Sequence, residues 1–241
     1  TLIVVVGSLA LPFFSPFHFL GNGYYLLLLS LICGSFGAAY FISNYVAQRH
    51  IDAGITNIVV NIYTPVTIIL SSMFIHEGLS NIQILGTIFL LFALVIVSKK
   101  HHLGKFRFDK YFLLMLFSGV MLGVLLVAER ALQKATGFSA GTMLSWWSQC
   151  AFLGLATLIT KGRHTYTKTE VFTTGILKFL QGLSYVILLW LVGNLSIVSS
   201  ITTFKVVIIF IAAALFLNER EDLGRKIFGS IIAVVGLLLM K

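Results

Sequence analysis

The sequence predicts an all-α, polytopic membrane protein, and three observations carry this prediction. Of the 241 residues, 58% are hydrophobic and only 10% are charged, and the mean hydropathy is +0.99. Soluble domains are about 45–50% apolar and about 25% charged. The charged residues also gather between long apolar blocks, which is the pattern of helices that cross a bilayer in succession.

Nine apolar blocks have about the length that a transmembrane helix requires, which is about 20 residues with a lower limit near 17. They cover roughly 1–14, 24–46, 54–75, 82–98, 111–131, 139–160, 171–192, 195–217 and 225–240. The chain opens on Thr1, with neither an initiator methionine nor a basic segment that would begin a signal peptide. We therefore expect a first helix to be missing before the first block, which would make ten.

The basic residues predict the orientation, because Lys and Arg in short loops stay on the cytoplasmic side. Alternate loops hold twelve of them: Arg49, Lys99, Lys100, Lys105, Arg107, Lys110, Lys161, Arg163, Lys168, Arg220, Arg225 and Lys226. The opposite loops and the C-terminus hold three, Arg130, Lys134 and Lys241. This bias predicts a multi-pass protein of the plasma membrane whose loops near 50, 100, 165 and 222 are cytoplasmic and whose C-terminus is outside.

The remaining compositional features predict neither a cofactor nor a nucleic-acid partner. Cys33 and Cys150 lie inside apolar blocks and are expected to be small core residues, not a disulfide or metal pair. The "KKHH" tract at 99–102 is expected to be a solvated basic loop, without a metal. The net charge of +9 is explained by loop residues that contact lipid headgroups, so membrane lipids and not nucleic acids are the expected charged partners.

An internal repeat relates the two halves of the chain. By the charge count, the loop at Glu77 lies outside and the loop at Glu219 lies inside, so the two copies would be inverted, as is common in transporters. The first copy is predicted at 1–99, with four visible helices, and the second at 107–241, with five. The aligned pairs are Ile84 with Ile227, Gly86 with Gly229, Ile88 with Ile231, Leu94 with Leu237, Glu77 with Glu219, and "GAAY" (37–40) with "GLSY" (182–185).

The first copy carries a more specific pattern, a proline in an apolar block (Pro65), a glutamate at its end (Glu77) and a glycine nine residues later (Gly86). This pattern resembles the repeat of the drug/metabolite transporter superfamily, EamA-like branch. The second copy departs from it, because no proline precedes Glu219. The resemblance implies two five-helix inverted repeats around a central cavity, which carry small organic solutes by alternating access as a monomer or weak homodimer.

Lys205 is the strongest candidate for contact with a solute. It lies about ten residues into its block, where a lysine costs roughly 2.5–3.5 kcal/mol on insertion scales, and no carboxylate is expected at similar depth. The alternative is a buried lysine bonded to backbone or to the missing helix. Lys178 is expected to reach the cytoplasmic surface instead. If both faced the cavity, the solute would be anionic or zwitterionic, as an amino acid is.

Further polar and aromatic residues would line the same cavity or bond neighbouring helices. These candidates are Asn57, Asn61, Tyr63, Trp146, Trp147, Gln181, Tyr185 and Tyr40. For Trp146 and Trp147 the alternative to stacking on a solute is packing in the core of the protein. Five residues are predicted to shape the repeated hairpin instead: Pro65, Glu77, Gly86, Glu219 and Gly229. For the two glutamates the alternative is a role as proton carriers, but charges at a helix end are tolerated structurally whereas charges at the midplane are functional.

The sequence thus predicts a secondary transporter and not an enzyme. It contains no P-loop pattern that would indicate ATP-driven transport. One alternative is a membrane-embedded enzyme that acts on lipids, which would need clustered acids, histidines or a nucleophile beside a base. A second is a lipid scramblase, which would need a polar groove open to lipid.

Overall fold

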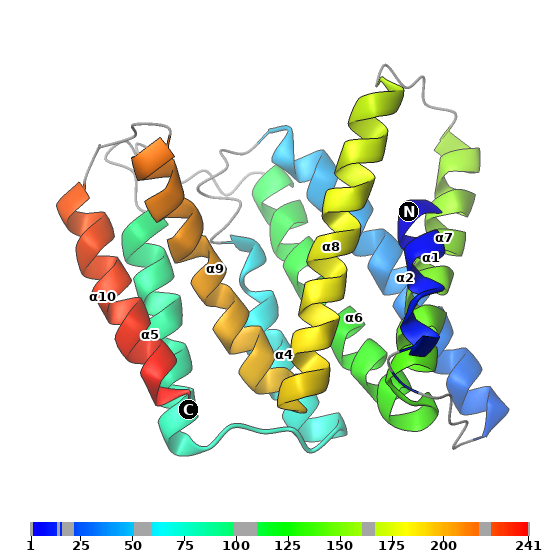
Figure 1. The fold of residues 1–241 in the computed structure, drawn as a ribbon, viewed down its shortest axis with the longest axis horizontal. Coiled ribbons are helices and arrows are strands. Elements are labelled where there is room, and N and C mark those ends of the chain that lie inside the picture. Colours follow the sequence, from blue (N-terminus) through cyan, green and yellow to red (C-terminus); the bar gives the residue numbers. More distant parts are fainter. Residues whose placement is uncertain are drawn as a thin grey trace. The chain divides into compact units, whose positions relative to one another are not determined.

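In the computed structural model, every element of the described residues is a helix (Figure 1), which confirms the all-α class. The structure describes residues 2–13, 15, 22–50, 59–98, 110–160, 167–216 and 223–240. The elements are α1 (Leu2–Ser8), the 3-10 helix η1 (Leu11–Phe13), α2 (Gly23–Gln48), α4 (Tyr63–Phe74), α5 (Asn81–Ser98), α6 (Lys110–Thr136), α7 (Phe138–Thr160), α8 (Lys168–Val192), α9 (Leu195–Phe216) and α10 (Leu223–Leu239).

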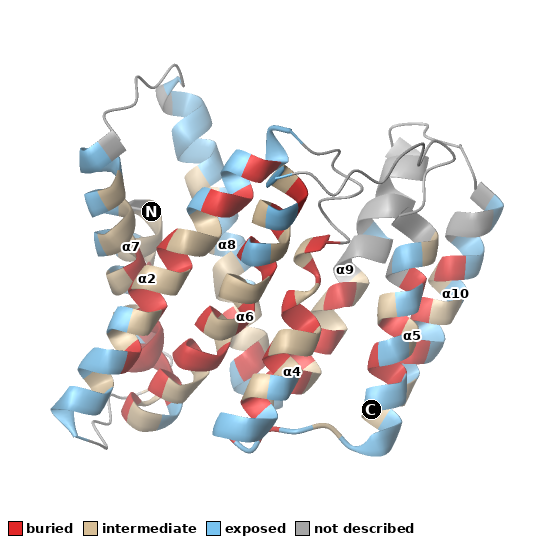
Figure 2. Cartoon of the chain, turned by 180° about the vertical axis from the view of Figure 1, so that it is seen from behind, coloured by how far each residue is buried: buried red, intermediate tan, exposed pale blue. Residues whose placement is uncertain are grey.

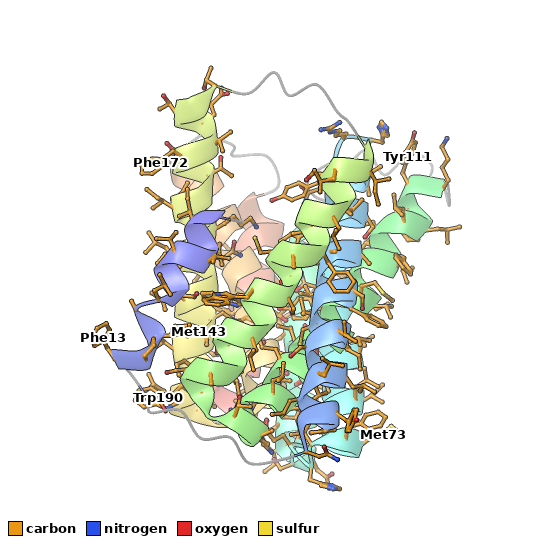
Figure 3. All side chains as sticks on the ribbon, turned by 90° about the vertical axis from the view of Figure 1, so that its right-hand side faces the viewer. Phe13, Met73, Tyr111, Met143, Phe172 and Trp190 are labelled. Carbon is orange, nitrogen blue, oxygen red and sulfur yellow. The ribbon has the colours of Figure 1, made fainter. Side chains whose placement is uncertain are left out.

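Four of the described helices are long and apolar enough to cross a membrane: Gly23–Gln48, Lys110–Thr136, Phe138–Ile159 and Thr169–Val192. Exposed positions recur along α7 and α8 (Figure 2). The side chains of Phe13, Phe172 and Trp190 point away from their helices (Figure 3), with exposed fractions of 91%, 60% and 46%. Such apolar surfaces suit lipid contact, so the structure agrees with a helical membrane protein.

The chain divides into two compact units, each with its own packing. Unit 1 consists of Thr1–Ile42 and Val124–Gly193, and unit 2 consists of Ser43–Gly123 and Asn194–Lys241. The boundaries between the units at residues 42/43 and 123/124 fall inside helices, so α2 and α6 each contribute residues to both units.

In unit 1, α1 packs against α7 and α8. The core of this packing is a cluster of Leu11, Phe138, Trp146 and Val186. The turn between α6 and α7 is a single residue, Gly137, whose φ of 84° lies in the left-handed region that glycine adopts without strain. The two helices therefore leave each other as a tight hairpin.

In unit 2, α5 lies beside α10, and α9 packs against α4, α5 and α10 (Figure 1). Glycines bring the first pair together, because a Cβ on Gly86 would lie 2.8 Å from the carbonyl oxygen of Gly236. Hydroxyl groups join α9 to α4 and α5. The hydrogen bonds are Ser71 to Ser196 at 2.6 Å, Thr87 to Ser200 at 2.9 Å, Tyr63 to Thr202 at 3.0 Å and Thr64 to Thr203 at 3.2 Å.

Two of the expected helices differ in the structure, and each of them contains a proline. The block at 54–75 is not one helix, because residues 61–62 form a turn and α4 begins at Tyr63, which places Pro65 in its first turn. Pro65 has no N–H to donate to the carbonyl of Asn61, and its ring would clash with that carbonyl in a continuous helix. The block at 1–14 is likewise not one helix, because α1 ends at Ser8 and Pro12 lies in the separate 3-10 helix η1.

Candidate functional site: a buried carboxylate in unit 1

Glu129 is a carboxylate inside an apolar helix, seven residues before the end of α6 at Thr136. Its side chain is only 5% exposed. One carboxylate oxygen, Oε2, accepts a hydrogen bond from the Ser145 hydroxyl of α7 at 2.5 Å. Among the described residues, this is the one hydrogen bond that the carboxylate accepts, and no basic side chain forms an ion pair with it.

Three further side chains surround the carboxylate. Gln149, one turn beyond Ser145 on α7, donates from Nε2 to the Ser145 hydroxyl at 2.9 Å. The thiol of Cys33 on α2 is fully buried and lies near Ser145 and Glu129. We call Cys33, Glu129, Ser145 and Gln149 the carboxylate cluster. Because the Ser145 proton points to Glu129 while its oxygen accepts from Gln149, the network is oriented to hold a hydrogen-bond acceptor at Glu129.

A second buried acceptor lies one turn along α6. Gln133 is 4% exposed, and its Nε2 donates to Thr142 Oγ1 of α7 at 3.0 Å. Its Oε1 is buried without a hydrogen-bond partner among the described residues. Glu129 and Gln133 are separated by four residues, so they lie on one face of α6, and both bond to α7. That face carries two oxygen acceptors in the interior of unit 1.

The cations nearest to Glu129 in the sequence are used elsewhere. Arg130 Nη2 donates to the backbone oxygen of Gly193, where α8 ends, at 2.5 Å. The Lys134 side chain is exposed. A charged carboxylate buried without a basic partner is costly. Ionisable groups inside membrane helices are therefore functional candidates by default, which makes Glu129 the centre of the candidate site.

Glu129 is not among the site residues that the sequence predicted. The apolar block ended at residue 131, which left Glu129 two residues from the boundary, and Arg130 and Lys134 were expected in a loop, whereas all three lie on α6. The segment from Glu129 to Thr136 is rich in helix formers, and Gly137 follows as a glycine that ends a helix. This glycine was the signal that could have extended the helix.

Some of the expected cavity residues also lie in unit 1. Trp146 is buried in the core cluster, where its ring meets Phe179 edge to face at 6.2 Å, and Tyr185 packs against the same cluster. Trp147 is half-exposed and its Nε1 donates to Ser8 Oγ at 2.8 Å. Gln181 is exposed and accepts a hydrogen bond from Lys178 at 3.2 Å. Tyr40 is half-buried beside Phe41.

Other candidates lie in unit 2 or outside the described residues. Tyr63 is buried at the start of α4, and Asn61 is buried in the turn before it. Gly229 is buried on α10. Asn57 and Glu219 lie outside the described residues, as does the side chain of Lys205, whose backbone belongs to α9. Among the described residues, no three His, Cys, Asp or Glu side chains form a group that could hold a metal.

Glu77 occupies the loop after α4 and is 6% exposed. Its Oε2 accepts a hydrogen bond from the backbone N–H of Leu195, the first residue of α9, at 2.7 Å. Its backbone oxygen accepts from Ser196 Oγ. Asn194 Nδ2 donates to the backbone oxygen of Gly78 at 3.2 Å. The glutamate therefore lies where a helix N-terminus attracts negative charge.

The comparisons with known proteins bear on the fold. No protein-family model matches the sequence, and no curated protein matches it. Fifteen chains of solved structures match, among them a crystal structure of a protein that superposes with a TM-score of 0.71. The two sequences are 14% identical, and the match covers 99% of this chain and 84% of the other. Similarity at this identity shows a shared fold and carries no function.

The packing of Gln149 gives a test of the cluster. A Cβ on Gly37 of α2 would lie 2.5 Å from Gln149 Cγ, so we expect Gly37→Val to displace Gln149 and to lower the free energy of unfolding by about 1–3 kcal/mol. Equilibrium unfolding in mixed micelles measures this loss. Gly154→Val on α7 is the matched control, because a Cβ there would have no atom of another described segment within 4 Å.

The double variant Gly37→Val with Gln149→Ala should recover part of the stability that Gly37→Val loses. Removing Gln149 supplies the missing space, so the two substitutions should couple in a double-mutant cycle. Purely additive losses would contradict the contact between Gly37 and Gln149.

Proposed function

We propose that this protein is a secondary transporter that moves a small organic solute across a membrane by alternating access. The proposal takes up the resemblance to the drug/metabolite transporter superfamily and its two inverted five-helix repeats. One observation carries it: helices that occupy equivalent places in the two proposed copies pack against each other in antiparallel fashion. An inverted repeat requires this arrangement for helices near its two-fold axis, which lies in the membrane plane.

The pairing of α5 with α10 is the clearest case. Gln83 Nε2 donates to the backbone oxygen of Met240, and further along α5 the backbone of Gly86 meets that of Gly236. Ala93 belongs to the same core cluster as Ala233. The residue numbers rise along α5 while they fall along α10, so the two helices run in opposite directions.

Two more pairs follow the same rule. Between α4 and α9, Thr64 bonds to Thr203 at 3.2 Å and Ser71 bonds to Ser196 at 2.6 Å. Between the N-terminal segment and α7, the contacts run from Ser8 with Trp147 to the backbone oxygen of Leu11 with Ser139. In both pairs the numbers again run in opposite directions, which supports an inverted repeat over much of the chain.

The proposed solute is anionic or zwitterionic, as an amino acid is, because Lys205 lies ten residues after Leu195 at the start of the apolar helix α9. A lysine at such depth supplies a positive charge that a solute carboxylate or phosphate would balance. The proposal also keeps the plasma membrane as the location, with the loops near 50, 100, 165 and 222 in the cytoplasm.

Substrate-dependent stability of the purified full-length protein tests this function. Amino acids, nucleobases, sugar-phosphates and cationic drugs would be screened for a rise in melting temperature, because a solute that binds the folded state stabilises it by about 2.7 kcal/mol at 100 times its Kd. We expect an anionic or zwitterionic solute to stabilise the protein and to enter vesicles that contain it.

Lys205→Ala should abolish that stabilisation, whereas Lys178→Ala should retain it, since Lys178 is exposed and bonded to Gln181. Stabilisation by cations alone, or an effect that survives Lys205→Ala, would contradict the proposed solute class. Vesicles that take up none of the screened solutes would contradict the transport function itself.

A further inference from the structure

Among the described residues, the groups that face the carboxylate cluster include no positive charge. On α2 the facing ionisable group is the thiol of Cys33, and on α7 the facing groups, Ser145 and Gln149, are not ionisable. On α6 itself, Arg130 bonds to Gly193 and Lys134 is exposed. Within the described residues, the charge of an ionised Glu129 is therefore not balanced by the protein.

The close packing around the Glu129 carboxylate limits the size of a cation that could neutralise its charge. Ser145 lies 2.5 Å from Oε2 and is fully buried, and Gln149 closes over Ser145 at 2.9 Å. With Glu129 only 5% exposed, an organic cation would have to displace these side chains. A proton needs no such space, because it forms an O–H bond on the carboxylate itself.

We propose that Glu129 is a proton-exchange site and that its proton is coupled to solute movement; the coupling rests on the proposed transport function. In the loading step a hydronium ion gives its proton to the Glu129 carboxylate, which forms one O–H bond and leaves one water molecule. In the unloading step the O–H bond breaks and a water molecule takes the proton. The site thus alternates between a negative and a neutral state.

The buried Oε1 of Gln133 gives this site a neighbour suited to the exchange. It is an acceptor without a hydrogen-bond partner among the described residues, on the face of α6 that carries Glu129. Buried acceptors are satisfied by donors such as ordered water. A water that donates to Gln133 is the kind of carrier from which Glu129 would take its proton.

Infrared difference spectroscopy of the full-length protein in lipid vesicles tests the site without reference to transport. The probe is the proton, added by changing from alkaline to acidic buffer. We expect the wild-type protein to gain a C=O stretching band of a buried protonated carboxyl, and Glu129→Gln to lack it. Glu129→Asp should restore a shifted band, and Glu170→Gln should keep the wild-type band, because Glu170 is exposed in the capping box of α8. Identical spectra for wild type and Glu129→Gln would overturn the proposal.

Uptake of a radiolabelled amino-acid mixture into the same vesicles tests the coupling. We expect a proton gradient to change the wild-type uptake rate several-fold, and to leave the rate of Glu129→Gln unchanged. A gradient that acts equally on both proteins would overturn the coupling. If the wild type takes up nothing while its infrared band is present, the transport function and the coupling fail, and the proton site alone is supported.

Discussion

Gly236→Leu is expected to lower the free energy of unfolding by about 3 kcal/mol, because it forces apart two helices whose backbones touch. A Cβ on Gly236 would lie 2.9 Å from the carbonyl oxygen of Gly86 and 3.1 Å from the backbone nitrogen of Leu90. Backbone atoms cannot rotate away as a side-chain end can. The helix α10 would therefore have to move from α5 along their whole contact. Loss of helical circular dichroism during unfolding in mixed micelles measures the effect.

Gly154→Leu is the matched control for this prediction. It places the same side chain on a helix glycine whose Cβ would meet no atom of another segment within 4 Å in the described part of the chain. Both substitutions remove a helix glycine, so their difference isolates the crossing of α5 and α10. Gly86→Leu should behave as Gly236→Leu does, since the contact is mutual. Equal stability of the variants at positions 154 and 236 would show that α5 and α10 do not need this close approach.

Hydropathy predicted the helical class and the approximate positions of the helices, because lipid-facing side chains make apolar blocks visible in the sequence. It failed where a partner helix, and not lipid, covers the side chain. Glu129 and Gln133 ended an apolar block at residue 131, yet both are buried where α6 meets α7. Their burial depends on contacts between helices, which the composition of one segment does not encode.

The repeat alignment did not predict which residue Gly86 contacts, and the reason is physical. It paired Gly86 with Gly229, but the backbone that Gly86 meets is that of Gly236, seven residues later. An alignment identifies positions that are equivalent in two copies, whereas a contact depends on how the copies pack. The block at 54–75 was expected to be one helix, whereas the structure has a turn at residues 61–62, because Pro65 cannot continue a helix from that point.

Glu77→Ala is expected to lower the free energy of unfolding by about 2 kcal/mol, because it leaves the buried N–H of Leu195 without an acceptor. The lost hydrogen bond is charge-assisted and lies at the N-terminus of α9, where the helix dipole favours a carboxylate. Glu77→Gln keeps an acceptor oxygen and should lose less. Glu170→Ala, at the exposed N-terminus of α8, should change stability less than Glu77→Ala does. Unfolding in mixed micelles measures all three.

Stability and proton response together separate a hairpin role for Glu77 from a role as proton carrier. If Glu77 only positions α9, Glu77→Ala should lower the stability of the protein more than Glu77→Gln does. Glu77→Gln should also keep the response of uptake to a proton gradient. A proton carrier would give the opposite result, with little loss of stability and no response to the gradient in Glu77→Gln. We expect the first result, since the Glu77 carboxylate bonds to the α9 backbone at 2.7 Å, whereas that of Glu129 bonds to a serine hydroxyl.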